Sequence, residues 1–290
     1  MQSAPSVLLG LQMPDVDRWS ERVAVALGKN PGPFTGPGTN TYLVGRGRRR
    51  LLLDTGDGRP DYLPVLERAL LETGCEIQEI VLTHGHPDHL GGARQVLERF
   101  GARRVSKLPW PGNDERYGVE VEPLADGSVV ESEGATLRAV HTPGHAPDHL
   151  AFWLDEERAL FSGDNVLGLG TTVIPAQPGS LRLYLASLEL LLALRPGAIY
   201  PAHGPRIADG VAKLREYLEH RREREAQVLA VLAEGPARIP EIVRRVYAAY
   251  PEALHAAAAQ SVGAQLLKLA EEGRARPGAG EPLEARWELP

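Results

Sequence analysis

The chain of 290 residues has a formal net charge of −6, with 43% hydrophobic and 24% charged residues, a composition typical of an ordinary globular protein. The acidic balance argues against a surface dedicated to nucleic acids, and no apolar run approaches the roughly 18 residues that a membrane span needs. Cys75, the single cysteine, excludes an internal disulfide, and no secretion-signal pattern is found, so we expect a cytoplasmic protein without membrane contact, bacterial by its preference for Arg and Ala over Lys and Asn.

The first two thirds of the chain alternate between strand-like and helix-like segments after a loose lead-in over residues 1–18. Strands are predicted where apolar and β-branched residues alternate or run together, and helices where apolar residues recur every three to four positions. This mixed order favours stacked layers of sheets and helices. The predicted strands are 19–27, 41–44, 49–53, 78–82, 104–107, 128–130, 136–140, 149–154, 159–161 and 199–200, and the predicted helices are 63–71, 93–100 and 181–194.

Two segments stand apart from this alternation. Residues 109–121, which hold Trp110 and Tyr117, are predicted to be a surface loop that walls a cleft. Residues 209–290 read as a long amphipathic helix, two further helices and a short hairpin, an order that resembles a winged helix. From Arg206 onward there are 13 basic and 13 acidic residues, so a packing or substrate-guiding role is favoured over DNA binding. We therefore expect a catalytic domain over 1–208 and a smaller module over 209–290.

The most informative motif is His84-Gly85-His86-Pro87-Asp88-His89, which places four metal-ligand side chains within six residues. An extended strand would put His84 and His86 on the same side, because side chains alternate with a period of two. A turn at Pro87 would then bring Asp88 and His89 around to face them. Imidazole nitrogens and carboxylate oxygens suit zinc. A surface loop that happens to be rich in His is the alternative.

Three later segments repeat one local pattern, a strand-like run followed by a loop of small residues that holds a possible metal ligand. The three candidates are His145, Asp164 and His203. Their glycines permit tight turns at strand ends, where loops carry function. Each segment alone is weak, since a lone His before Gly is more often structural. Together, in one chain and in this order, they predict a metal centre at one edge of the sheets.

These motifs resemble those of the metallo-β-lactamase-fold hydrolases, across roughly residues 20–205. The resemblance implies an α/β (α+β) fold, an αββα sandwich of two sheets between helices, here followed by the winged-helix-like module. A bridging metal ligand at Asp164 and a further metal ligand at His89, as the resemblance implies, fit the glyoxalase II and RNase Z types of this superfamily better than true metallo-β-lactamases. Within it, four segments look most like the subgroup named beta-lactamase-like protein 2, namely 30–33, 38–44, 53–56 and 170–173.

The resemblance also implies a role for each candidate ligand. His84, His86 and His145 would hold one Zn²⁺, and Asp88, His89 and His203 the second, with Asp164 bridging both. The two cations would share a hydroxide as the nucleophile, which Asp88 would orient. Manganese or iron could replace zinc, because His and Asp ligands select weakly among these metals.

Further polar residues have both a functional and a structural interpretation. Asp54, after the 49–53 strand, either fixes a ligating His through its remote nitrogen or is a turn residue. His141 and His149 are expected to be strand or loop residues. His220 and Arg221 lie on the long helix, where alternating Glu and Arg favour a solvated face; the functional alternative is contact with substrate.

The ligand set predicts hydrolysis more firmly than it predicts a substrate. The subgroup resemblance implies cleavage of phosphodiesters in single-stranded RNA, which the acidic net charge disfavours. The main alternative is thioester hydrolysis on an acyl carrier or a small thiol. Hydrolysis of another small ester, a lactone or a β-lactam follows, and a metal-binding scaffold without activity comes last.

Overall fold

The computed structural model describes residues 10–290 and divides them into two compact units. The first unit holds the residues through Thr142, Asp148–Gly170 and Arg195–Val211; the second holds Pro143–Pro147, Thr171–Leu194 and Ala212–Pro290. The boundary expected between residues 208 and 209 stays a prediction. Residues 1–9 of the expected lead-in lie outside the described part.

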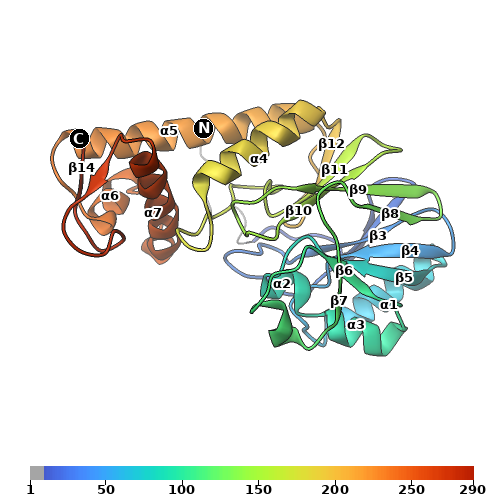
Figure 1. The fold of residues 1–290 in the computed structure, drawn as a ribbon. Coiled ribbons are helices and arrows are strands. Elements are labelled where there is room, and N and C mark those ends of the chain that lie inside the picture. The colour runs from blue at the N-terminus through green and yellow to red at the C-terminus, as the bar shows by residue number, and fades with distance from the viewer. Residues whose placement is uncertain (1–9) are drawn as a thin grey trace. The chain divides into compact units, whose positions relative to one another are not determined.

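The first unit contains two β-sheets (Figure 1). The seven-stranded sheet has the order β1-β2-β3-β4-β5-β6-β7, antiparallel up to β4 and parallel from β4 to β7. Its strands are β1 (Val16–Arg18), β2 (Val23–Leu27), β3 (Asn40–Val44), β4 (Arg49–Leu53), β5 (Glu76–Val81), β6 (Val105–Lys107) and β7 (Val121–Pro123).

The second sheet has five strands in the order β12-β11-β10-β9-β8, with β11 and β12 parallel. The main core lies between the two sheets, where alternate residues such as Tyr42, Leu53, Phe152 and Phe161 are fully buried. The strands are β8 (Val129–Ser132), β9 (Ala135–His141), β10 (Leu150–Leu154), β11 (Ala159–Gly163) and β12 (Ala198–Pro201).

Helices α1 (Tyr62–Thr73) and α3 (Ala93–Phe100) cover the other face of the seven-stranded sheet. Both helices end at a glycine in the left-handed region, Gly74 and Gly101, as their sequences predict. Because the middle of this sheet is buried on both faces, β2 is apolar throughout and β4 ends in three leucines. Packing on both sides holds the carboxyl ends of the parallel strands, from which the metal-ligand loop departs.

The second unit is mainly helical. Trp287 is fully buried in a core shared with the helices, which holds the C-terminal hairpin against them, and its indole N–H donates to Pro282 O at 2.8 Å within the hairpin. This order of helices followed by a hairpin is the one that the sequence predicts for a winged helix. The elements are α4 (Leu181–Leu194), α5 (Gly210–Ala233), α6 (Ile239–Val246), the 3₁₀ helix η3 (Glu252–Leu254), α7 (His255–Glu271), β13 (Arg276–Pro277) and β14 (Trp287–Glu288).

Three details differ from the expected elements. The first predicted strand begins at Val23, because Trp19 and Ser20 form a turn whose N–H groups donate to Val23 O. The lead-in contains the edge strand β1. Its two charged and exposed residues, Asp17 and Arg18, do not form the apolar pattern from which strands are predicted. The expected loop at 109–121 contains the 3₁₀ helix η2 (Asp114–Tyr117) and the start of β7. Within residues 10–290, no helix is long and apolar enough to cross a membrane.

Candidate metal centre

The His-rich motif begins where β5 ends. Its backbone is extended at His86 (φ −72°, ψ 153°), and Pro87 then opens the short helix α2 (Pro87–Leu90). An extended segment followed directly by a helical turn brings His84 and His86 from the first part, and Asp88 and His89 from the second, to one place. The sequence predicted this turn from Pro87, although not the helix.

Two further candidate ligands come from the second sheet. Because β11 and β12 are parallel, their carboxyl ends lie at the same edge. Asp164 follows β11 directly and His203 follows β12, and the N–H of Ala202 donates to Gly163 O at 3.1 Å, which joins the two loops. The two sheets thus contribute ligands to the same centre.

Asp88, His89, Asp164 and His203 form one cluster, called here the second site. His203 Nε2 lies 3.2 Å from both Asp88 Oδ2 and Asp164 Oδ1, and His89 Nε2 lies 3.5 Å and 3.4 Å from the same oxygens. Ligand atoms around a tetrahedral zinc ion, with bonds of ~2.0–2.1 Å, lie roughly 3.3 Å apart. His89 Nε2 is buried and has no hydrogen-bond partner among residues 10–290. The spacing and the donor chemistry therefore fit a cation.

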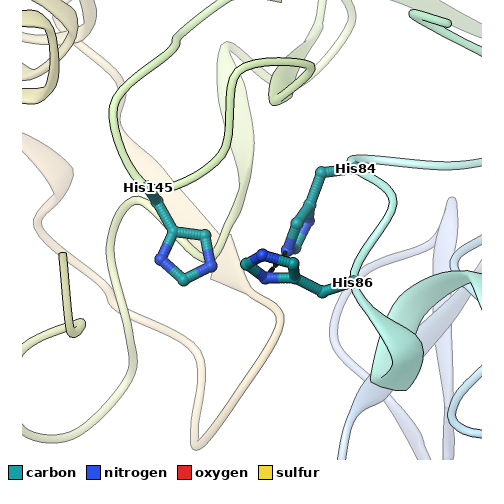
Figure 2. Close-up of side chains that lie close together, drawn as sticks. All are labelled: His84, His86 and His145. Carbon is teal, nitrogen blue, oxygen red and sulfur yellow. Dashed lines mark hydrogen bonds between the residues drawn. The ribbon is translucent and has the colours of Figure 1, made fainter. Parts of the chain in front are cut away.

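His84, His86 and His145 form the other cluster, called here the first site. In Figure 2, a dashed line marks the close contact between ring nitrogens of His84 and His86, and the ring of His145 lies beside them. His84 Nε2 lies 2.9 Å from His86 Nδ1. His145 lies in the loop between β9 and β10, whose facing ends pair at His141 and Leu150. Three imidazoles without a carboxylate form a donor set that suits zinc or another transition metal.

Asp54 holds the remote nitrogen of His89. Its carboxylate Oδ2 accepts a hydrogen bond from His89 Nδ1 at 2.8 Å, and Oδ1 accepts one from the N–H of Thr83 at 2.8 Å. Asp54 has φ 61°, the left-handed region that non-glycine residues seldom occupy. This contact leaves His89 Nε2 to face the second site. The effect of Asp54 on metal binding stays a prediction.

Three other candidate ligands, His84, His145 and His203, also have partners for their remote nitrogens. His84 Nδ1 lies 3.0 Å from Thr83 Oγ1, and His145 Nδ1 donates to Val173 O at 2.9 Å. His203 Nδ1 lies 3.4 Å from Gly38 O, a longer contact. Each ring is therefore oriented by its surroundings before any metal binds.

The electrostatics of the second site show what this arrangement lacks without a cation. Burial alone would lower the pKa of His203, but the carboxylates of Asp164 and Asp88 outweigh burial and raise it to about 10. In the same way burial would raise the pKa of Asp164, yet His203 and His89 hold it well below its usual value. Protons on the two imidazoles thus take the place of positive charge, which a metal would supply instead.

His149, expected to be an ordinary strand or loop residue, has a closer connection to the centre. It is fully buried, its Nδ1 lies 2.8 Å from Thr142 Oγ1, and its Nε2 accepts the N–H of Asp164 at 3.1 Å. Sequence spacing could not reveal this, because the partner is a backbone group 15 residues away. His141 ends β9, as a strand residue should.

His220 and Arg221 lie within the second unit. Arg221 is only 7% exposed, donates to Thr172 O at 2.7 Å and stacks over the Tyr184 ring, so the expectation of a solvated face is wrong for this residue. His220 is half-buried, and burial, with Arg221 and Arg224 next in importance, lowers its pKa to about 4. Contact of either side chain with substrate stays a prediction.

Two known protein families match parts of this chain. A model of the Metallo-beta-lactamase superfamily matches residues 34–203, and a model of the Beta-lactamase associated winged helix domain matches residues 239–287. The first match ends at His203 and includes every candidate ligand. The second covers α6, α7 and the β13–β14 hairpin.

Two curated relatives and one solved structure extend these matches. The chain is 41% identical over 261 residues to a "Beta-lactamase-like protein 2 homolog" of Caenorhabditis elegans, covering 89% of this chain and 87% of that protein. It is 40% identical over 248 residues to an "Atrochrysone carboxyl ACP thioesterase" of Aspergillus chevalieri, covering 83% and 78%. A beta-lactamase domain protein from Burkholderia ambifaria superposes with a TM-score of 0.83 at 21% identity, covering 97% and 96%. The curated relatives are a nematode and a fungal protein, so they do not support the expected bacterial source.

Proposed function

Because this chain belongs to the metallo-beta-lactamase superfamily and is one of its hydrolases, we propose that it hydrolyses thioesters at a centre of two metal ions. One observation carries the choice of substrate class. A relative 40% identical over most of both chains is named an acyl-carrier-protein thioesterase. The name of that relative also specifies one acyl group, and we propose no particular acyl group for this chain.

We propose seven ligands for the metals, divided between the first and second sites with Asp164 shared. The near-tetrahedral spacing at the second site and the three imidazoles at the first support this assignment. Zinc suits both donor sets, and iron or manganese would fit the oxygen-rich second site. The proposed ligands are His84, His86, Asp88, His89, His145, Asp164 and His203.

Two cations held there would lower the pKa of water and polarise a substrate carbonyl. Asp88, a proposed ligand whose carboxylate is partly exposed, would accept a hydrogen bond from the attacking water and orient it. The remote contacts of Asp54 and Thr83 would keep the ligating rings from turning. Trp110, whose ring centroid lies 6.1 Å from that of His86, would offer an apolar wall to the acyl part.

Cleavage of single-stranded RNA is the second candidate. The 41% identity to a beta-lactamase-like protein 2 homologue supports it, because resemblance to that subgroup implies cleavage of single-stranded RNA. The net charge of −6 and the balanced charges of the C-terminal module weigh against it. We therefore place it behind thioester hydrolysis.

The test is one assay panel on protein loaded with zinc, manganese or iron. Acyl thioesters of coenzyme A and of a carrier protein would be compared with labelled single-stranded RNA of mixed sequence. We expect thioester turnover that is lost in Asp164→Ala. RNA cleavage without thioester turnover, lost in the same variant, would reverse the order of the two candidates.

A further inference from the structure

A fully buried lysine lies beside the metal-ligand loop. Lys107, the last residue of β6, is 0% exposed. Its ammonium donates to both carboxylate oxygens of Asp114 at 2.9 Å and 2.8 Å, to Leu108 O at 2.7 Å, and lies 2.9 Å from Asp148 Oδ2. Burying a charge costs several kcal/mol unless it is paired and hydrogen-bonded. Such a group persists only where its surroundings hold it in one geometry.

The partners of Lys107 come from two other parts of the first unit. Asp114 begins η2 and also accepts the N–H of Trp110 at 2.7 Å, so it fixes the loop after β6. Asp148 lies two residues before β10, beside His149. Lys107 therefore ties the end of one sheet to the entrance of a strand in the other. Lys107, Asp114, Asp148 and the neighbouring Asn113 are called here the Lys107 cluster.

The Lys107 cluster packs directly on the peptide between two metal ligands. Asn113 Nδ2 donates to Gly85 O at 2.8 Å. A Cβ added at Gly85 would lie 2.6 Å from Asn113 Nδ2, 3.1 Å from Asp114 Oδ1 and 3.2 Å from Asp148 Oδ2. A side chain at Gly85 would therefore require these neighbours to shift, so the cluster fits closely against the peptide that separates His84 from His86.

We propose that the Lys107 cluster is a positioning site for the first metal. It fixes the Gly85 peptide, and with it the angle between the rings of His84 and His86, before the metal arrives. None of its members supplies a ligand atom, so its effect reaches the metal through Gly85. A rigid pair of ligands binds more tightly than one that must be ordered on binding, and outer partners of this kind are typically worth ~10–100-fold in metal affinity.

The sharpest test removes one hydrogen bond and no charge. Asn113→Ala deletes the contact with Gly85 O and leaves Lys107 and both carboxylates paired. Gln78→Ala is the matched control, because Gln78 is also an amide side chain that donates to a backbone carbonyl, Glu131 O at 2.9 Å, at an exposed place on β5. Each change would be made in a His203→Ala chain, to isolate the first site, and in a His86→Ala chain, to isolate the second.

We expect Asn113→Ala to weaken Co²⁺ and Zn²⁺ binding at the first site by roughly tenfold and to change the visible spectrum of bound Co²⁺. Binding at the second site and the Tm of the metal-free chain should stay within the range of Gln78→Ala. Unchanged first-site affinity, or an equal loss at both sites, would overturn the proposal.

The inference rests on the metal centre of the proposed function and not on its substrate. If the unmodified chain binds no metal, the proposed function fails. If it binds two metals and Asn113→Ala binds them equally well, only the positioning role fails. Gly85→Ala gives an independent check, because it should produce the same first-site loss by crowding the cluster instead of removing a contact.

Discussion

Charged side chains are buried differently in the second unit and at the second site of the first unit. In the second unit, the buried guanidinium of Arg221 meets a carbonyl and an aromatic ring, and Glu225 meets both Lys268 and Arg274. At the second site of the first unit, carboxylates and imidazoles converge at distances of 3.2–3.5 Å that are longer than good hydrogen bonds. The first pattern matches each charge with a protein group and stabilises a fold. The second would be completed by a cation, which makes it the candidate for chemistry.

The largest expected effect comes from the shared ligand. Asp164→Ala should lower metal content from two per chain to less than one and abolish turnover, because both sites lose a donor. His203→Ala should remove mainly one metal. Elemental analysis of the two variants measures this difference in metal content. If Asp164→Ala retained two metals, the contrast between charges paired within the protein and charges completed by a cation would be lost.

Asp88→Asn comes next. The amide keeps the size of the side chain but loses its charge, so we expect kcat to fall on the order of a hundredfold or more and second-site affinity to fall as well. Cys75→Ser is the control and should leave turnover within about twofold, since Cys75 is not among the proposed ligands. Activity that survives chelation, or is lost with Cys75, would point to a protein nucleophile.

His149 sharpens the comparison, because it contacts Asp164 through the backbone N–H and not through the carboxylate. His149→Ala frees the N–H of Asp164, and we expect metal affinity at both sites to fall by about tenfold. His149→Gln, whose amide oxygen can accept the same N–H, should recover part of this loss. Equal affinities in all three chains, measured by competition with a chelator, would make His149 a packing residue only.

Arg221→Met tests the second unit. Losing the hydrogen bond to Thr172 O should cost about 1–3 kcal/mol of stability, read by urea denaturation of the metal-free chain. If Arg221 also contacts RNA, the variant should show a higher KM and a flatter salt dependence on that substrate. A variant that alters only KM, with unchanged stability, would contradict our structural reading of this arginine.

The smallest effect concerns pH. The folded chain depresses the pKa of His220 to about 4, below its ordinary value near 6.5. The unfolded chain therefore binds the extra proton first, so this contribution is present above about pH 6.5 and is lost as pH falls towards 4. His220→Gln should flatten the fall of Tm across that window. A slope identical to that of the unmodified chain would mean that His220 is solvated in both states.

Sequence patterns predicted most of the elements and the local origin of each ligand, because strands, turns and glycines are read from neighbouring residues. They could not predict contacts made by the backbone of distant segments. In the sequence, His149 resembles an ordinary strand residue, and only the fold places Asp164, at the end of β11, next to it. Lys107 resembles an exposed basic residue at the end of a strand, although it is fully buried. Arg221 lies in a run of alternating Glu and Arg that is typical of a solvated helix, and only tertiary packing buries it.

The metal ligands are spread along the chain, from the end of β5 in one sheet to the ends of β11 and β12 in the other. A cation bound by both Asp88 and His203 would be a cross-link that closes a long loop and connects the two sheets at one edge. Cross-links across loops of about 100 residues can withhold up to roughly 4.7 kcal/mol of chain entropy from the unfolded state. A chain with one cysteine has no disulfide of its own to do this. The metal content should therefore govern how readily a protease cuts the protein, apart from any reaction that it catalyses.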